Sequence, residues 1–338
     1  MVARSGLDVA SDGVARIGEE RIRSAAEPLT VVYVTGVGRS GTTIFSNVLN
    51  EIEGWFNAGE LSGMWKHVAL GEDGGGTCGC GRCLLDCPVW SRILDTEVEP
   101  GMTLAAWAPV IATSMRERFR NHHTWRLLRR RLDAASAADV RTLGVVYRAI
   151  QAATGARVIV DTSKEASGAA ALFRIEGITP RVVHMVRDPR AVAYAWRRPK
   201  MDLVRIDALK STWHWLSFNL AAESVNRCWP HSALRLRYED FVADPEAAVA
   251  RVLRLVGEPV ERSPVRRSVV VLNPNHTVQG NPNRFVTGAV QIREDDAWRT
   301  GITAGMAVKV SALALPQLRR YGYPAMVRPR RDDRAPSC

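Results

Sequence analysis

The chain has 338 residues, of which 46% are hydrophobic and 24% charged, so one or two folded domains are expected and a wholly disordered chain is excluded. No apolar run reaches the ~18–20 residues of a membrane helix, and the first thirty residues lack the apolar core of a secretory signal. We therefore expect a cytoplasmic protein without membrane contact. Arginine dominates the 46 basic side chains behind the net charge of +11, which favours a phosphate-like ligand. The densest basic runs lack interleaved aromatics, so a nucleic-acid partner is not expected.

Taken in chain order, the sequence predicts a loose N-terminal arm (1–28), one α/β domain (29–324) and a polar tail (325–338). Short β-branched runs predict strands at 31–34, 157–160, 181–186 and 233–236. Apolar periodicity predicts helices at 42–49, 167–176, 189–198 and 245–256. Strands that alternate with helices predict a mostly parallel central sheet covered on both faces.

Two stretches interrupt this alternation. Residues 62–150 are predicted to be mostly helical, apart from a Gly/Cys loop at 71–88, and to form a cap inserted into the domain. A tryptophan-rich helix is predicted around 211–219. On it Trp215 and Asn219 share a face while Trp213 points elsewhere. We expect these tryptophans mainly to pack in the core or cap, with acceptor contact as the lesser alternative.

The segment Gly36-Val-Gly-Arg39-Ser40-Gly41-Thr42-Thr43 follows a buried-type strand and opens a helix, the setting in which backbone N–H groups bind an anion. The glycine spacing is that of a P-loop, but Thr42 stands where nucleoside triphosphatases have lysine. The cation is Arg39, inside the loop. The pattern therefore predicts a phosphate-like ligand that is held differently from ATP.

A second basic turn ends the predicted strand 181–186 and enters the next helix. Arg187 at a strand end should point toward the crevice where open parallel sheets bind ligands. Asp188 and Pro189 are typical of a helix N-cap and first helical position, and both interpretations can hold together.

These motifs resemble the P-loop sulfotransferases that use 3′-phosphoadenosine-5′-phosphosulfate (PAPS), in particular the bacterial branch related to tyrosylprotein and carbohydrate sulfotransferases. Residues 37–43 are similar to the family's 5′-phosphosulfate loop, 183–192 to its 3′-phosphate motif, and 237–245 to its Tyr-Glu-Asp segment. Residues 276–285, followed by 296–298, resemble its C-terminal cofactor loop. Together they cover about residues 30–323 in the family's order.

The resemblance implies a three-layer P-loop fold and PAPS as sulfuryl donor. It implies that Arg187 binds the 3′-phosphate, that Tyr238 contacts the adenine, and that Arg284 closes a flap over the nucleotide. The implied donor-binding residues are Arg39, Ser40, Gly41, Thr42, Thr43, Arg187, Tyr238, Asn281, Arg284 and Phe285. One departure is Ala195, where the family usually has a serine that bonds the 3′-phosphate; Arg190, Tyr194 or Arg284 could substitute.

Sulfuryl transfer needs a base for the acceptor, a grip on the sulfonate and a cation for the leaving phosphate, but no catalytic metal. Glu60 follows the first helix, where the chain should return toward the loop, and the resemblance implies that a Gly-Glu at this distance supplies the base. His67, His214 and His276 are alternatives, although His276 is expected to order the cofactor loop. We expect Arg39 and Lys164 to complete the catalytic set. Lys164 follows a strand, where Asp161 or Ser163 could orient it, but it could also be a solvent-facing lysine.

Four cysteines, Cys78, Cys80, Cys83 and Cys87, lie close together in the Gly/Cys loop. Four thiolates can close a structural zinc site, but this spacing is not the usual paired C-x2-C. Similar loops occur in bacterial members of the family that the chain resembles. A structural metal, a disulfide and free thiols all remain open.

The sequence therefore predicts a PAPS-dependent sulfotransferase, monomeric or homodimeric, that acts on a small-molecule, sugar or peptide acceptor. The acceptor should enter between the sheet edge and the cap. A nucleotide-dependent kinase is the closest alternative, disfavoured by Thr42, and a non-catalytic P-loop binding protein is the other.

Overall fold

The structure is a computed structural model, and it describes residues 29–71, 76–129, 131–198 and 206–326. The predicted N-terminal arm lies outside the described residues, as does the predicted tail from residue 327 onward.

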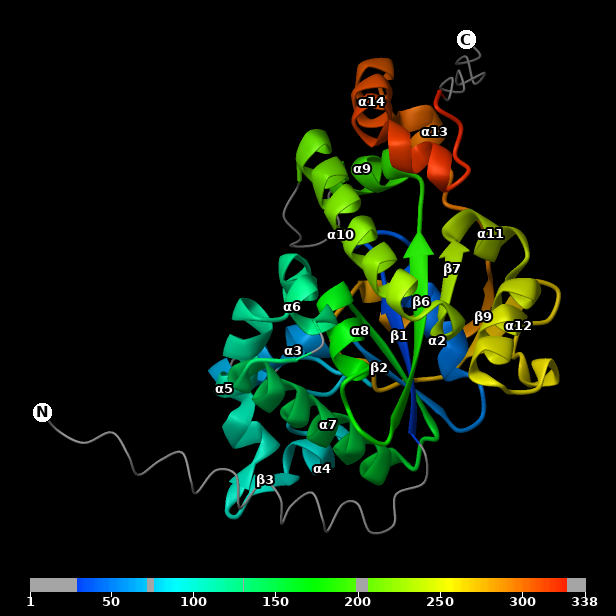
Figure 1. Cartoon of the computed structure of the whole chain (residues 1–338). Coiled ribbons are helices and arrows are strands. Elements are labelled where there is room, and N and C mark those ends of the chain that lie inside the picture. The colour runs from blue at the N-terminus through cyan, green and yellow to red at the C-terminus, as the bar shows by residue number, and fades with distance from the viewer. Residues whose placement is uncertain (1–28, 72–75, 130, 199–205, 327–338) are drawn as a thin grey trace, which may run out of the picture.

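A five-stranded sheet forms the centre of the molecule, with strand order β2-β5-β1-β6-β7 and every neighbouring pair parallel (Figure 1). The four predicted strands are confirmed as β1 (Leu29–Thr35), β5 (Val158–Lys164), β6 (Ile178–Val186) and β7 (Ala233–Arg237). The edge strand β2 (Trp55–Gly59) was not predicted, because its sequence WFNAG has no β-branched residue and contains Asn and Gly.

Helices cover both faces of the sheet, which confirms the three-layer α/β prediction. On one face lie α2 (Thr42–Asn50), α11 (Tyr238–Ala243) and α12 (Pro245–Val256), beside the antiparallel pair β8 (Val269–Leu272) and β9 (Gly288–Gln291). Alternate residues of β1 point to opposite faces, so that Val32 and Val34 join this core while Val31 and Tyr33 join the other.

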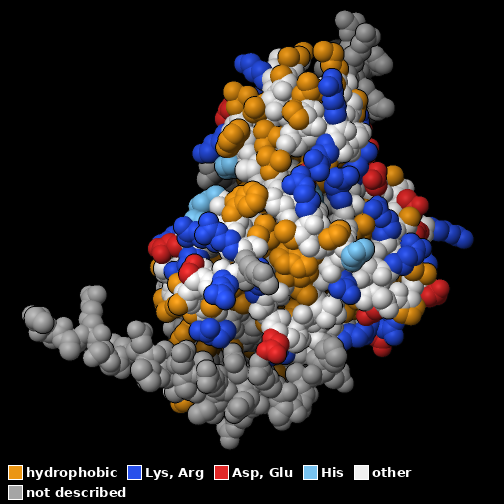
Figure 2. All heavy atoms as spheres, viewed as in Figure 1, with side chains coloured by type: hydrophobic (Ala, Val, Ile, Leu, Met, Phe, Trp, Pro, Cys, Tyr) orange, Lys and Arg blue, Asp and Glu red, His pale blue; other side chains and the backbone are white. Residues whose placement is uncertain are grey.

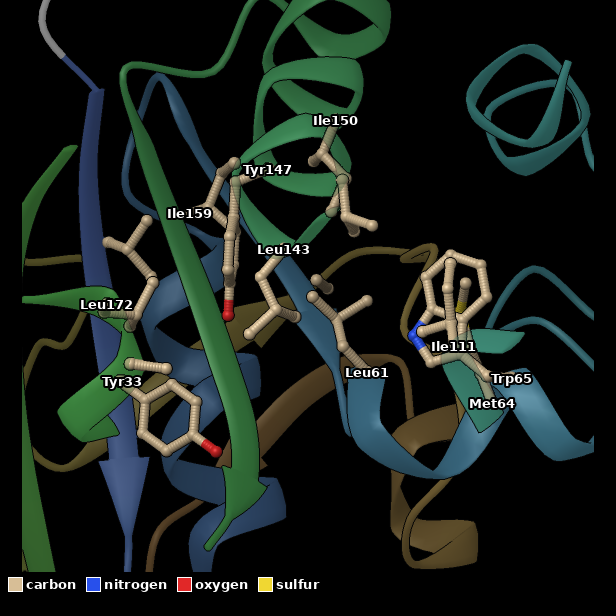
Figure 3. Close-up of a cluster of buried hydrophobic side chains, with 14 of the residues drawn as sticks. Tyr33, Leu61, Met64, Trp65, Ile111, Leu143, Tyr147, Ile150, Ile159 and Leu172 are labelled. Atoms are coloured by element: carbon tan, nitrogen blue, oxygen red, sulfur yellow. The ribbon is translucent and has the colours of Figure 1, made fainter. Parts of the chain in front are cut away.

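The second face is covered by α7 (Ala134–Thr154), α8 (Ala166–Leu172) and α10 (Ala208–Cys228). Figure 3 shows Tyr147 and Ile150 of α7 in the same buried cluster as Tyr33 and Ile159 of the sheet. Outside them pack α3 (Leu61–Leu70), α4 (Trp90–Leu94), α5 (Leu104–Glu117), the hairpin β3 (Glu97–Glu99) with β4 (Met102–Thr103), η2 (Asn121–His123) and α6 (Thr124–Leu128). The predicted helical segment 62–150 thus supplies part of the layer on this face.

Some predicted boundaries were wrong. The helix expected at 167–176 ends at Leu172, and β6 begins at Ile178 rather than at Arg181. Pro180 lies within this strand although it lacks an N–H donor. β6 pairs with β7 only from Val182 onward, so Pro180 has a strand neighbour on one side only.

Beyond the carboxyl ends of β6 and β7 lie α9 (Pro189–Arg197), α13 (Trp298–Gly301) and α14 (Ala304–Arg320) (Figure 1). Short 3-10 turns complete the fold: η3 (Pro230–Ser232), η4 (Val260–Arg262) and η5 (Pro282–Phe285). Across the described ranges, no helix has both the length and the apolar character needed to cross a membrane.

Candidate active site

The predicted site residues gather at the carboxyl ends of the five parallel strands. Glu60 follows β2, Lys164 ends β5 and Arg187 follows β6. The phosphate loop 36–41 follows β1, and Tyr238 follows β7. Because parallel strands end at one edge of a sheet, residues from five distant segments are brought to the same edge, where open parallel sheets bind ligands.

The phosphate loop connects β1 directly to α2, as predicted. Gly36 has φ 131°, and a Cβ there would lie 2.2 Å from the carbonyl oxygen of Met185. Gly41 has φ 82°, and a Cβ there would lie 2.4 Å from Cδ2 of Tyr238. Both positions therefore require glycine for conformation and for space.

The loop presents hydrogen-bond donors that lack protein acceptors. No side chain caps α2, and its first turn contains no acidic residue. Within the described residues, the Ser40 hydroxyl is fully buried and has no hydrogen-bond partner. An uncapped helix N-terminus beside a buried, unpaired hydroxyl fits an anionic group, such as a phosphate or sulfate.

Arg39 lies at the tip of this loop with a left-handed φ of 71°. Its guanidinium lies 5.1 Å from the ring centroid of Trp196 on α9. Burial lowers the pKa of Arg39, while the negative charge of Glu60 acts in the opposite direction. A non-glycine residue in this conformation is uncommon, and such residues concentrate at functional sites.

Glu60 and Lys164 form an ion pair between Oε1 and Nζ. The two residues stand at the carboxyl ends of β2 and β5, which are parallel neighbours in the sheet. Lys164 also has a left-handed φ, 75°, at the point where the register between β1 and β5 shifts. Its carbonyl accepts a hydrogen bond from Gly36 N at 3.4 Å, which joins the end of β5 to the phosphate loop.

Asp161 and Ser163 order the backbone beside this ion pair. The Ser163 hydroxyl accepts a hydrogen bond from Ser62 N at 2.9 Å and so fixes the first turn of α3, which Glu60 precedes. Asp161 accepts hydrogen bonds from Ser163 N at 2.7 Å and from the Tyr147 hydroxyl at 2.6 Å. Burial raises the pKa of Asp161 to about 6. Ser163 thus helps to position Glu60 by fixing the start of α3.

Arg187 is 5% exposed and contacts several other residues of the candidate site. It donates to the carbonyl of Arg39 at 3.0 Å, and its guanidinium lies 4.3 Å from the ring centroid of Tyr238. Its Nη2 donates to Asp295, at 2.8 Å to the carbonyl and 3.3 Å to Oδ2. The Asp295 side chain is 52% exposed, so a carboxylate on a surface loop engages the arginine predicted to bind a phosphate.

The C-terminal loop lies over Glu60. Val278 forms two backbone hydrogen bonds with the end of β2: Glu60 N donates to its carbonyl at 2.9 Å, and Val278 N donates to Ala58 O at 3.0 Å. Arg284 donates to Gly280 O and Thr77 O, each at 3.1 Å, and stacks on Phe285. Burial lowers the pKa of Arg284, with the charge of Glu60 acting in the opposite direction. Asn281 caps η5 by accepting from Asn283 N.

Cationic side chains are frequent on one face of the molecule. On the face shown in Figure 2, Lys and Arg side chains predominate and Asp and Glu side chains are sparse. This distribution suits an anionic ligand.

The family model described as "Sulfotransferase family" matches residues 32–262, more than half of the chain. This chain belongs to the sulfotransferase family. No curated protein matches its sequence at a significant level.

The sulfotransferase is also similar to solved structures at low identity. A sulfotransferase domain from the curacin biosynthetic pathway is 14% identical, with a TM-score of 0.49 and coverage of 89% of this chain and 99% of that one. A sulfotransferase domain from the Synechococcus PCC 7002 olefin synthase is 18% identical, with a TM-score of 0.47 and coverage of 89% and 97%. Sulfotransferase STF9 from Mycobacterium avium is 16% identical, with a TM-score of 0.48 and coverage of 92% and 81%.

The resemblance implies a serine where this chain has Ala195. Arg190, one of the residues that could substitute for it, is engaged in other contacts. Arg190 is fully buried and forms a two-pronged ion pair with Asp188, at 2.9 and 2.6 Å. Asp188 caps α9 by accepting from Arg190 N, as predicted. The Tyr194 hydroxyl lies against Gly301, the last residue of α13, and Arg284 donates to Gly280 O and Thr77 O.

The histidine alternatives differ in their surroundings. His67 lies seven residues beyond Glu60 on α3, which is about 10 Å along a helix axis. His214 lies on α10, and burial lowers its pKa. His276 faces Cys78 and Cys87, at 3.7 and 3.2 Å from their sulfurs.

The tryptophan-rich helix confirms the predicted faces, but the expectation of core or cap packing holds for Trp215 and is wrong for Trp213. Trp215 is fully buried, whereas Trp213 is 63% exposed. Trp215 donates from Nε1 to the carbonyl of Arg187 at 2.8 Å, so this core residue also holds the strand end that carries Arg187.

Sequence reasoning missed three buried or half-buried polar residues near the site. Asn57 donates to Asn47 Oδ1 at 3.4 Å, and Asn47 donates to Asn283 O at 3.4 Å, which links α2 to the C-terminal loop. Their positions among apolar residues were a usable signal. Glu165 precedes α8, and burial raises its pKa to about 7.

Proposed function

We propose that this sulfotransferase transfers a sulfuryl group from PAPS to a hydroxyl or amine of a small-molecule, sugar or peptide acceptor in the cytoplasm. The observation that carries the proposal is the contact between Glu60 and Lys164 beside a phosphate loop with an unpaired buried hydroxyl. A base, a cation and an anion site are the three groups that the chemistry requires.

In this proposal the loop residues Arg39, Ser40, Gly41, Thr42 and Thr43 bind the 5′-phosphosulfate. PAPS would supply a sulfuryl group whose bond to the 5′-phosphate oxygen breaks as the acceptor oxygen or nitrogen bonds to sulfur, leaving adenosine 3′,5′-bisphosphate. Backbone N–H groups at the start of α2 hold the phosphate, and Arg39 neutralises charge on the sulfonate.

Glu60 accepts the proton that the acceptor loses. Its carboxylate is held by Lys164, and its backbone is fixed by Val278 and by the Ser62–Ser163 hydrogen bond. Lys164 can donate to the leaving phosphate when it releases Glu60, so one cation serves the base before transfer and the leaving group after it.

Arg187 binds the 3′-phosphate, which requires it to exchange Asp295 for the ligand. Tyr238 contacts the adenine, and its ring also packs against Gly41 and Arg187, so it supports both phosphate motifs. Asn281, Arg284 and Phe285 belong to the loop that closes over the nucleotide.

A mass-spectrometric screen tests the activity. Purified protein is incubated with PAPS and panels of phenols, sugars, tyrosyl peptides and amines, without added Mg²⁺. We expect one acceptor class to gain a sulfuryl group, and this product to be absent with the Glu60→Gln variant. If adenosine 3′,5′-bisphosphate neither forms nor binds, the proposal is wrong.

A further inference from the structure

Three cysteines and one histidine converge beside the active site. The sulfurs of Cys78, Cys80 and Cys87 and Nδ1 of His276 all lie within 4.8 Å of one another. The cysteines come from the loop after α3, whereas His276 comes from the start of the C-terminal loop. Cys78 and Cys87 are fully buried.

Four of the six distances between these atoms are close to those of a tetrahedral metal site, and the other two are within 4.8 Å. Zn–S bonds of about 2.3 Å and Zn–N bonds of about 2.0–2.1 Å place the ligand atoms of a tetrahedron about 3.5–3.8 Å apart. The sulfur–sulfur distances in the structure are 3.5 Å for Cys78–Cys87 and 3.8 Å for Cys80–Cys87. His276 Nδ1 lies 3.2 Å from Cys87 and 3.7 Å from Cys78.

Cys83 is not part of this group, so the structure does not bring the four cysteines of the loop to one point. Its backbone pairs with Thr77 across the loop, and its sulfur is not among the converging atoms. The fourth position is filled by His276, which lies 198 positions beyond Cys78 in the sequence. No local cysteine spacing could indicate this ligand.

A disulfide explains the arrangement less well. It would use two sulfurs at about 2.05 Å and would leave a third thiol and an imidazole turned toward the same point without a function. All five cysteines in the described ranges are free thiols. Three thiolates and one imidazole are instead a common ligand set for zinc.

We propose that Cys78, Cys80, Cys87 and His276 bind one structural Zn²⁺. Four protein ligands complete the tetrahedron and leave no open position for substrate, so the ion serves the fold and not the transfer chemistry. This proposal does not depend on the identity of the sulfuryl donor.

The ion would join the cysteine loop to the C-terminal loop at a point where the backbones already touch. Gly79 N donates to Thr277 O at 2.8 Å, and Trp90 Nε1 donates to His276 O at 2.6 Å. Two residues beyond His276, Val278 pairs with Glu60 and Ala58. The zinc would thereby hold the segment that fixes the backbone of Glu60 and that leads to Arg284.

Metal analysis of the purified full chain tests the proposal. We expect about one zinc per chain, and an X-ray absorption spectrum with three sulfurs and one nitrogen around the metal. Cobalt substitution should give the visible bands of tetrahedral thiolate coordination. Absence of stoichiometric metal, a four-sulfur shell, or a disulfide found by mass spectrometry after alkylation would each overturn the proposal.

Single-residue variants distinguish the proposed zinc ligands from other cysteines of the chain. Cys87→Ser and His276→Ala should lower the zinc content at least tenfold, whereas His276→Cys should retain the metal with four sulfurs. Cys83→Ser, in the same loop, and Cys228→Ser, far away on α10, are the matched controls and should bind zinc normally. Equal loss in the Cys83 variant would contradict the assignment. Should a ligand variant not fold, the absorption spectrum of the unmodified chain still decides.

Hydrogen exchange tests, independently of metal content, whether the ion orders the segment around Val278. Removing zinc with a chelator should increase exchange at the amides of Glu60 and Val278, which bond across the two loops, more than at amides of β1. Unchanged exchange at these two amides would mean that the ion does not order the segment.

Discussion

Glu60 and Lys164 form an ion pair at the carboxyl ends of two neighbouring parallel strands, although 104 positions separate them in the sequence. Lys164 holds this position with a left-handed backbone, and Glu60 is tied through its own N–H to the C-terminal loop. The two groups proposed as base and leaving-group cation are therefore held in direct contact by separate parts of the fold.

Replacing Glu60 with glutamine should abolish transfer without abolishing donor binding. The amide keeps the shape but cannot accept the acceptor's proton, so turnover should fall about 10²–10⁴-fold. Single-turnover measurements with PAPS check this effect. Glu53→Gln, an exposed carboxylate in the preceding turn, is the control and should keep full activity. Near-normal turnover of the Glu60 variant would return the histidine alternatives to consideration.

Replacing Arg187 with glutamine should weaken PAPS binding by about 1.5–3 kcal/mol, or roughly 10–150-fold, because a charge-assisted contact is lost. Adenosine 5′-phosphosulfate, which lacks the 3′-phosphate, should bind almost unchanged. Calorimetric titration with both ligands measures the difference. Arg181→Gln, in the first half of β6, is the matched control. Equal losses for both ligands would show that Arg187 serves the loop structure rather than the 3′-phosphate.

Replacing Asp295 with asparagine should strengthen PAPS binding several-fold. In the structure its carboxylate lies 3.3 Å from Nη2 of Arg187, so an incoming phosphate must displace a group of the same charge. The neighbouring Asp296→Asn variant, also exposed, controls for the change in net charge. A gain shared by both variants, or by adenosine 5′-phosphosulfate, would mean that Asp295 does not compete at the 3′-phosphate site.

Glu165 should make the folded state less stable as the pH rises. Burial raises its pKa in the folded chain to about 7, above the usual value of 4.5. Between these values the unfolded chain has lost the proton that the folded chain retains, so the free energy of unfolding falls with increasing pH and levels off above about 7. Glu165→Gln removes this dependence and should be more stable at pH 8 by up to about 3 kcal/mol.

Urea unfolding at pH 4, 6 and 8 measures this effect. Burial also raises the pKa of Asp161. Asp161 is present both in the unmodified chain and in the Glu165→Gln variant, so its contribution to the pH dependence cancels in the comparison. Parallel pH profiles for the two proteins would contradict the prediction.

The local pattern of the sequence was sufficient for parts of the site that lie on one strand–turn–helix unit. The phosphate loop and the Arg187 turn are such units, because their glycines, cap residue and strand residues are consecutive. Four strands and the helix 245–256 were predicted for the same reason. The end of α8 was missed because the chain leaves the helix in a turn before β6, and no proline or glycine marks Leu172.

Contacts between separate strand–turn–helix units could not be predicted from the local sequence pattern. The contact of Glu60 with Lys164 depends on β2, an edge strand without a β-branched residue. The contact of Asp295 with Arg187 joins a surface loop to a strand end, and that of His276 with Cys87 joins two loops. These contacts depend on tertiary packing and on no local propensity.

Donor selectivity in the absence of added Mg²⁺ tests the central claim most directly. Thermal unfolding is followed with adenosine 3′,5′-bisphosphate, adenosine 5′-phosphosulfate and ATP, each at the same concentration. A ligand that binds only the folded state at 100 times its Kd should stabilise it by about 2.7 kcal/mol, which raises Tm by several degrees. We expect this shift for the bisphosphate and little or none for ATP. A shift with ATP alone, or with none of the three, would contradict a PAPS-dependent site.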